Sequence, residues 1–211
     1  MTKIKICGVT NLDDAHAAVD AGADMLGVNF YRPSPRYITP DAARELINDL
    51  KGRSMAVEIV GVFVNETVDS VIDVAMITGI DAVQLHGDES PSFCEELNTR
   101  DGLQVIKALR VNKEFKPHDA QQYPVAAIML DAFHRTLRGG TGEKVDFNLA
   151  RETRKLVPRL FLSGGLSPEN VADAINQVGP DAVDACSLLE SSPGKQDAAR
   201  MRAFVAAVRN S

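Results

Sequence analysis

The sequence predicts an α/β fold, a single-domain (βα)8 barrel (a TIM barrel) that spans residues 1–211. Apolar runs rich in β-branched residues alternate with helical patterns along the chain, which is typical of repeated βα units. Eight units in 211 residues give roughly 26 residues each, a normal length for one strand and one helix. The expected strands begin near Lys3, Asp24, Glu58, Asp81, Leu103, Val125, Arg159 and Asp181.

The first expected strand ends in a cysteine. Lysine and isoleucine alternate over residues 3–6, which is the period of a strand, and Cys7-Gly8 follows. Thr10 and Asn11 are suited to cap the helix that comes next. Because ligands bind at the carboxyl ends of parallel strands, Cys7 is expected at a binding site.

Local signals recur at the expected helix ends. Glycines that end a helix in the left-handed conformation are expected at Gly22, Gly79 and Gly179. Hydroxyl caps followed by proline are expected to begin helices at Thr39, Ser90 and Ser167. An apolar stripe with helical spacing, which predicts a helix lying on a sheet, comprises Val68, Val71, Ile72, Ala75 and Met76.

Two units are longer than the others, and the additional residues fall in segments 31–39 and 133–146. Both segments follow an expected strand, so in a barrel they lie on the same face as Cys7. The rival architecture is a doubly wound open sheet, which usually has a glycine-rich fingerprint after its first strand. Residues 7–10 do not form such a fingerprint, and the barrel is favoured.

Composition limits the partners. The net charge of −6 argues against a nucleic-acid partner but does not exclude a small anionic ligand. No apolar run approaches the roughly 20 residues of a membrane span, and no signal peptide is recognisable. Three widely spaced cysteines do not make a disulfide framework. We expect a cytoplasmic protein without a membrane partner.

Candidate functional residues stand at the expected strand ends: Cys7, Asn29, Asn65, His86, Arg110, Asp131, Ser163 and Asp184. Structural roles are the alternative for each of them. A buried cysteine is commonly a small hydrophobe, and His86 could be a hydrogen-bonded core residue. Asp131 could cap a turn, although ending an apolar strand on a charge costs desolvation unless something uses it.

Two glycine-rich stretches suggest anion binding. Gly164 and Gly165 follow an expected strand and precede a helix expected at Ser167, an arrangement that presents free amides to an anion such as phosphate. The alternative is a tight connection between a strand and a helix. Gly140 lies in a second stretch, which is either a further anion contact or a hinge.

Arg36 follows a proline in the long second loop, where a guanidinium is suited to grip a carboxylate with two hydrogen bonds. The alternative is a solvated loop arginine. Metal-ligand spacing, a P-loop and a serine elbow do not occur, so no metal and no cofactor are expected. A thiolate and a carboxylic acid on facing strand ends suit proton transfer around a sugar.

Seven motifs together make the sequence resemble the phosphoribosylanthranilate isomerase family over essentially its whole length. They occur in family order at residues 5–8, 34–36, 60–65, 83–87, 130–132, 139–142 and 164–171. The resemblance implies an isomerase of tryptophan biosynthesis that acts without a cofactor. Its reaction is the Amadori rearrangement of N-(5-phosphoribosyl)anthranilate to 1-(2-carboxyphenylamino)-1-deoxyribulose 5-phosphate. Cys7 is then the expected general base and Asp131 the expected general acid.

The resemblance also implies the substrate contacts. The expected substrate-binding residues are Arg36, His86, Gly140, Gly164, Gly165, Asp184 and Ser187. Arg36 would hold the anthranilate carboxylate, and the loops after strands seven and eight the phosphate. Because family members occur as monomers and dimers, a monomer or a homodimer is expected.

Two alternatives remain at this stage. A related phosphosugar isomerase, such as that of the histidine pathway, is expected to have aspartate as its first-strand base, and Cys7 argues against it. A barrel that binds a phosphosugar without turnover is less favoured because Cys7, Asp131 and Arg36 are all present.

The eighth-strand loop departs from the family pattern. Leu188 replaces a glycine, so a positive φ there would strain the backbone and alter phosphate binding. Cys186 is expected near Cys7, because strands one and eight adjoin in a closed barrel, and this pair is expected to be sensitive to oxidation. A catalytic thiol needs a lowered pKa or a proton relay, and the sequence does not identify its source.

Overall fold

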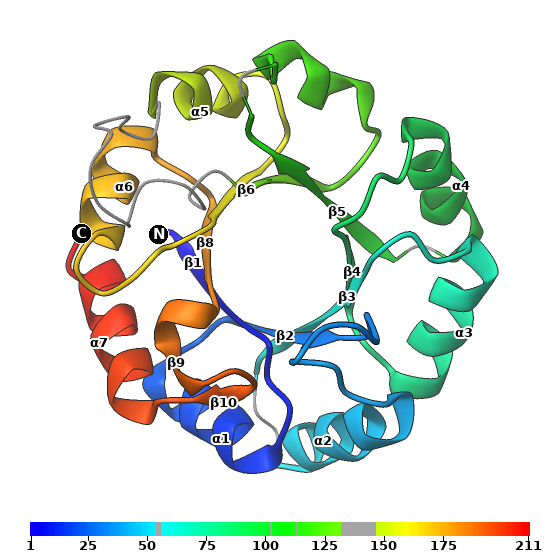
Figure 1. Cartoon of the computed structure of the whole chain (residues 1–211), viewed down its shortest axis with the longest axis vertical. Helices are drawn as coiled ribbons and strands as arrows, with labels where there is room; N and C mark the ends of the chain where they lie inside the picture. Colours follow the sequence, from blue (N-terminus) through cyan, green and yellow to red (C-terminus); the bar gives the residue numbers. More distant parts are fainter. Residues whose placement is uncertain (54–55, 102, 113, 132–146) are drawn as a thin grey trace.

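The computed structural model describes residues 1–53, 56–101, 103–112, 114–131 and 147–211. Eight parallel strands among them form a closed barrel in sequence order, with the first strand paired to the eighth (Figure 1). Each begins within two residues of its expected position, so the predicted fold class is confirmed. The strands are β1 (Lys3–Cys7), β2 (Met25–Asn29), β3 (Glu58–Phe63), β4 (Ala82–Leu85), β5 (Gln104–Arg110), β6 (Ala127–Asp131), β7 (Leu160–Ser163) and β8 (Ala182–Ala185).

Helices surround the barrel on its outside (Figure 1). They are α1 (Leu12–Ala21), α2 (Pro40–Gly52), α3 (Val68–Thr78), α4 (Pro91–Asp101), α5 (Phe147–Arg154), α6 (Val171–Val178) and α7 (Ala198–Arg209). Two short 3-10 helices, η1 (Pro117–Gln122) and η2 (Ser187–Leu189), and a hairpin of β9 (Glu190–Ser192) and β10 (Lys195–Gln196) complete the described elements. None of the described helices is long and apolar enough to cross a membrane.

Most of the predicted helix boundaries are confirmed. The Asn11 side chain accepts a hydrogen bond from the Asp14 amide at the start of α1, and the Thr39 side chain caps α2. The three predicted glycines follow α1, α3 and α6 in the left-handed conformation.

One local prediction was wrong, and another was confirmed only in part. Helix α6 begins at Val171 rather than at Ser167, because the Ser167 hydroxyl accepts a hydrogen bond from the Glu169 amide and closes a separate turn first. The helix predicted from the apolar residues 68–76 is present as α3, and its Val71 and Ala75 side chains are buried. Met76 is 73% exposed, so only part of the predicted apolar stripe packs against the barrel.

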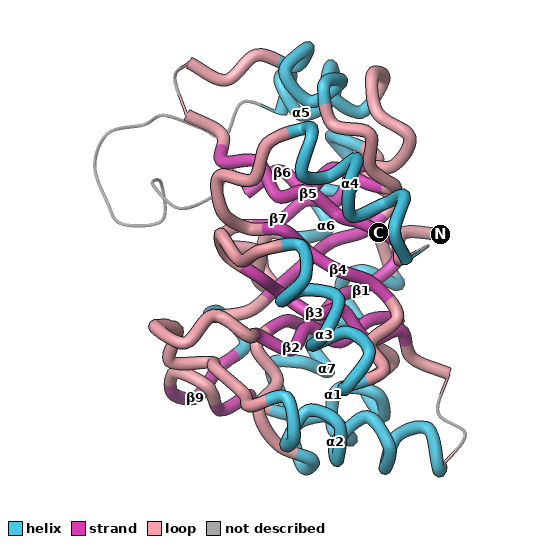
Figure 2. The backbone as a smooth tube through the Cα atoms, turned by 90° about the vertical axis from the view of Figure 1, so that its right-hand side faces the viewer, coloured by secondary structure: helices cyan, strands magenta, loops and turns pink. Residues whose placement is uncertain are grey.

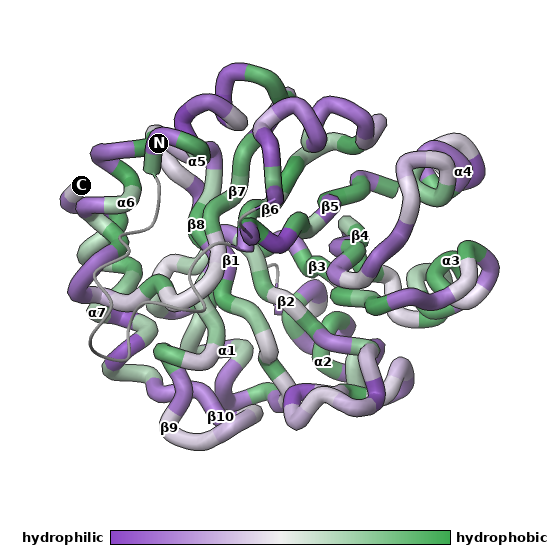
Figure 3. The backbone as a smooth tube through the Cα atoms, turned by 45° about the horizontal axis from the view of Figure 1, so that its top comes forward, coloured by the Kyte–Doolittle hydropathy of each residue, from purple (hydrophilic) through white to green (hydrophobic). Residues whose placement is uncertain are grey.

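Alternation along the strands separates two apolar cores. Ile4 and Ile6 belong to the large core between the barrel and its helices, and the strands carry much of the hydrophobic colour in Figure 3. Lys5 and Cys7 alternate with them and face the inside of the barrel. The inner core consists of Met25, Val60, Ala82, Ile106, Ala108, Ala127, Met129, Phe161 and Ala182. This inner core closes the barrel lumen below the strand ends.

The two ends of the barrel differ. Both chain termini lie at the amino-terminal side of the strands, and β9 lies at the opposite side (Figure 2). The long second loop reaches back to the sheet through a bridge between Asn29 and Tyr37. The long loop predicted over 133–146 lies outside the described residues.

Candidate active site

A cavity of about 290 Å³ opens at the carboxyl end of the strands. Two of the residues expected at strand ends, Asn65 and Arg110, are not among the residues that line this cavity. Gly140 lies outside the described residues. Every other predicted site residue lines this cavity: Cys7, Arg36, His86, Asp131, Gly164, Gly165, Asp184 and Ser187.

The Cys7 thiol lies beside Cys186. In the pairing of β1 with β8, Ile6 is opposite Ala185, so Cys7 at the end of β1 and Cys186 directly after β8 both follow this pair. A hydrogen bond from Cys186 and the nearby Lys5 ammonium lower the pKa of Cys7 to about 7, although burial and Asp184 act in the other direction. The same contact raises the pKa of Cys186 well above its ordinary value. Cys7 is therefore the thiol that ionises first.

Lys5 forms a fully buried ion pair beneath this thiol. Its Nζ lies 2.7 Å from Asp184 Oδ1, and the Ser163 hydroxyl donates to Asp184 Oδ2 at 2.9 Å. Burial opposes the charge on Lys5, but the Asp184 carboxylate and Cys7 outweigh it, so the pKa of Lys5 is raised. Both oxygens of Asp184 are thus engaged within the protein.

Asp131 on β6 is next to an imidazole. His86 Nε2 lies 3.3 Å from Asp131 Oδ2, and the buried Gln84 amide nitrogen lies 2.8 Å from His86 Nδ1. The Gln84 contact fixes the orientation of the ring against the carboxyl group. A carboxyl group with a neighbouring hydrogen-bonding ring is suited to hold and deliver a proton.

Arg36 is oriented by an acidic residue that follows η2. Its Nε and Nη2 donate to the two carboxylate oxygens of Glu190 at 2.7 and 2.6 Å. Hydrogen bonding to Glu190 raises the pKa of Arg36 further. A guanidinium has five N–H donors, so this pairing leaves donors for a second anion at the cavity wall.

The glycine pair after β7 presents free backbone amides. Gly164 (φ 91°) and Gly165 (φ 72°) both adopt left-handed conformations that favour glycine. Among the described residues, none accepts a hydrogen bond from either amide. Because α6 begins at Val171, the predicted anion site rests on these amides more than on the helix end.

The predicted strain at Leu188 does not occur. Of the non-glycine residues that the structure describes, only Asn65 has a positive φ, and Leu188 lies within η2. The first amides of a 3-10 helix lack intrahelical partners, and both Ser187 and Leu188 line the cavity. Their backbone amides are therefore candidates to donate to a bound anion.

Sequence reasoning missed three residues that shape the site: Lys5, Gln84 and Glu190. The sequence contains a hint for Lys5 and Gln84, because residues two apart in a strand point to the same face. Lys5 precedes Cys7 by two positions, and Gln84 precedes His86 by two. Glu190 carried no local signal, since its partner Arg36 is 154 residues away.

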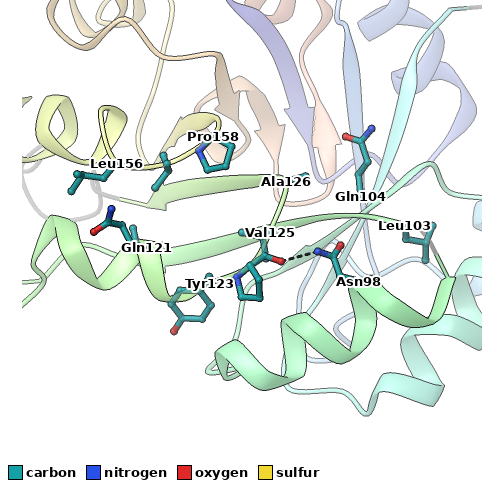
Figure 4. Close-up of a pocket in the computed structure, with 12 residues that line it drawn as sticks. Asn98, Leu103, Gln104, Gln121, Tyr123, Val125, Ala126, Leu156 and Pro158 are labelled. Carbon is teal, nitrogen blue, oxygen red and sulfur yellow. Dashed lines mark hydrogen bonds between the residues drawn. The ribbon is translucent and has the colours of Figure 1, made fainter.

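A larger hollow of about 710 Å³ lies at the opposite end of the barrel, before β5, β6 and β7. In Figure 4 the Asn98 side chain points to the Pro124 carbonyl, to which it donates at 2.7 Å. Tyr123 is the only titratable side chain among the described residues that line this hollow. The larger hollow therefore lacks the pair of acidic and basic groups that lines the smaller cavity. In the described part of the chain, no group of three metal-ligating side chains occurs at either end.

Comparisons with known proteins point to one family. The model of N-(5'-phosphoribosyl)anthranilate (PRA) isomerase matches residues 4–207. The isomerase of Geobacter sp. (strain M21) is 46% identical over 206 residues, which cover 98% of this chain and 97% of the relative. A PRA isomerase solved in complex with reduced 1-(o-carboxyphenylamino)-1-deoxyribulose 5-phosphate superposes with a TM-score of 0.88 at 40% identity and full coverage of both chains. Monomers generated from the dimeric isomerase of Thermotoga maritima superpose with a TM-score of 0.83 at 37% identity, also with full coverage of both chains.

Proposed function

The chain belongs to the N-(5'-phosphoribosyl)anthranilate isomerase family and catalyses its Amadori rearrangement in tryptophan biosynthesis, and we propose that Cys7 is the general base and Asp131 the general acid. One observation carries these assignments: both side chains line the same cavity, together with Arg36 and the glycine pair Gly164-Gly165. The product is 1-(2-carboxyphenylamino)-1-deoxyribulose 5-phosphate.

In the first step the Asp131 carboxyl group gives its proton to the furanose ring oxygen. The bond between C1 and this oxygen breaks, and the anthranilate nitrogen supplies the electron pair that forms a Schiff base. His86 supports this step because its ring lies within hydrogen-bond distance of Asp131 and can donate to the carboxylate that forms.

In the second step the Cys7 thiolate removes the proton from C2, and the electron pair moves to form an enolamine. This intermediate then tautomerises to the ketone. A thiol whose pKa is lowered to about 7 is suited to this step, because much of it is ionised near neutral pH while it remains a useful base.

The substrate contacts follow from the two charged ends of the molecule. Arg36, already aligned by Glu190, offers its remaining N–H donors to the anthranilate carboxylate. The amides of Gly164, Gly165 and Ser187 are proposed to hold the phosphate. Contacts of Asp184 and Gly140 with substrate stay predictions.

The decisive experiment follows the fluorescence of freshly generated N-(5-phosphoribosyl)anthranilate as the enzyme consumes it. We expect rapid decay with the wild-type chain, and for Asp131→Asn and Cys7→Ala a loss on the order of 10² to 10⁴-fold. The control is Asp73→Asn, which changes an exposed carboxylate on α3 in the same way and should keep full activity. Wild-type activity in Asp131→Asn would overturn the assignment of the acid.

We further propose a cytoplasmic enzyme that is a monomer or a homodimer. Three free cysteines, two of them buried, support a reducing location. Light scattering after size exclusion gives the oligomeric state, and subcellular fractionation of the producing cells gives the location.

A further inference from the structure

Lys5 is given no contact with substrate in the steps described so far, yet it lies inside the barrel on the same strand face as Cys7. Its side chain is 0% exposed, and its Nζ lies 2.7 Å from Asp184 Oδ1. A buried ammonium is costly unless it is paired, so its presence two residues below a reactive thiol calls for a physical reason.

Gly27 on the neighbouring strand locates the two groups relative to each other. A Cβ added at Gly27 would lie 2.6 Å from Cys7 Sγ and 3.1 Å from Lys5 Nζ. The sulfur and the ammonium therefore lie over the same point of β2, where only a glycine leaves room for both. Lys5 Nζ thus lies close to both the Asp184 carboxylate and the Cys7 sulfur.

We propose that Lys5 is a positioning residue for the reaction: its buried ammonium, held by Asp184, stabilises the thiolate of Cys7. This inference rests on the proposed role of Cys7 as the base. Asp184, fixed in turn by the Ser163 hydroxyl, keeps Lys5 charged and prevents it from moving away from the thiol. The direction of the pKa changes at Lys5 and Cys7 agrees with this arrangement.

The rival explanation is that a buried lysine pair only stabilises the barrel. The chain contains a matched case, because Lys107 on β5 is 1% exposed and its Nζ lies 2.6 Å from Glu89 Oε2. Lys107 alternates with the inner-core residues Ile106 and Ala108 and therefore faces the outside of the barrel, away from the cavity. Removing either lysine leaves a buried carboxylate without its cation, and both changes destabilise the fold by a similar mechanism.

The test compares Lys5→Met with Lys107→Met in the full chain. The rate at which iodoacetamide alkylates Cys7 is measured from about pH 5 to about pH 9 and resolved by peptide mass spectrometry. The pH profile of kcat/KM is recorded in parallel. For Lys5→Met we expect the Cys7 titration and the acidic limb of kcat/KM to move up by about one pH unit, a tenfold loss of thiolate at low pH. For Lys107→Met both curves should stay in place.

Three outcomes decide the matter. An unchanged Cys7 titration in Lys5→Met, or an equal shift in Lys107→Met, would overturn the proposal. A shifted titration without a shift in kcat/KM would support Lys5 as the partner of the thiolate but overturn Cys7 as the base. If Lys5→Met does not fold, Lys5→Gln, which keeps a donor for Asp184 but lacks the charge, replaces it and should show the same upward shift, whereas Lys5→Arg, which keeps the cation, should retain the wild-type titration.

Discussion

At the scale of single residues, the site depends on how the protein controls one thiol. Cys7 has Lys5 on its own strand and Cys186 on the adjoining strand, and both favour its ionised form. Cys94, by contrast, is buried in α4, and burial raises its pKa to about 11. The three cysteines of this chain therefore differ in reactivity because their surroundings differ.

The pH dependence of the reaction should reflect the Cys7 thiol. A base must be deprotonated, so the acidic limb of kcat/KM should rise with pH through about 7. Cys186→Ala removes the hydrogen-bond donor, raises the pKa of Cys7 and should move this limb to higher pH. Cys186→Ser keeps a donor and should restore it. A limb that does not move in Cys186→Ala would contradict the assigned contact.

Mild oxidation should inactivate the enzyme reversibly. The Cys7 thiolate attacks hydrogen peroxide and becomes a sulfenic acid as hydroxide leaves, and the Cys186 thiol then forms a disulfide with it and releases water. We expect dithiothreitol to restore activity in wild type. In Cys186→Ser, which lacks the second thiol, recovery should fall at high peroxide because Cys7 oxidises further. Full activity of wild type after peroxide treatment would rule out this pair as a redox site.

At the scale of elements, single capping residues determine where several helices end, and glycines in the left-handed conformation end α1, α3 and α6. Gly179 ends α6 with a φ of 65°, and a Cβ built there meets nothing within 4 Å. Its requirement for glycine is therefore a matter of backbone conformation and not of space. Gly52, the last residue of α2, also has open space but lacks a positive φ.

This contrast gives a paired stability prediction. Gly179→Ala should lower the free energy of unfolding by about 1 to 2 kcal/mol, the cost of a left-handed non-glycine residue. Gly52→Ala should leave it unchanged or raise it by up to about 1 kcal/mol, because alanine is the better helix former. Urea denaturation measures both. Equal effects of the two changes would show that backbone conformation at Gly179 is not what selects glycine.

At the scale of the whole molecule, the barrel is closed by the contact between its first and last strands. Beside this seam the Arg209 side chain of α7 donates to the carbonyls of Thr2 and Gly22 and to the Asp24 carboxylate, which ties the two ends of the chain together. Because no strand of the barrel has a free edge, loss of any unit opens the sheet. This continuity supports the expectation of a single domain over residues 1–211, which stays a prediction.

Unfolding in urea should therefore occur in one transition. We expect far-ultraviolet circular dichroism and pulse alkylation of Cys94, which is fully buried, to report the same midpoint. Exposure of Cys94 before the loss of secondary structure would instead indicate that the α4 region unfolds separately.

The sequence alone predicted the eight strands of the barrel, where they start, most helix ends and the face on which the candidate site lies. These features depend on local periodicity, on capping residues and on the rule that parallel strands deliver their carboxyl ends to one face. The family motifs added the reaction and the pair Cys7 and Asp131.

Only the tertiary structure decided which strand-end side chains converge. It excluded Asn65 and Arg110 from the cavity, paired Arg36 with Glu190 and placed Lys5 below Cys7. The physical reason is that such contacts join side chains on different strands and loops, some of them more than 150 residues apart. Their geometry is set by barrel closure and side-chain packing, which no local pattern in the sequence encodes.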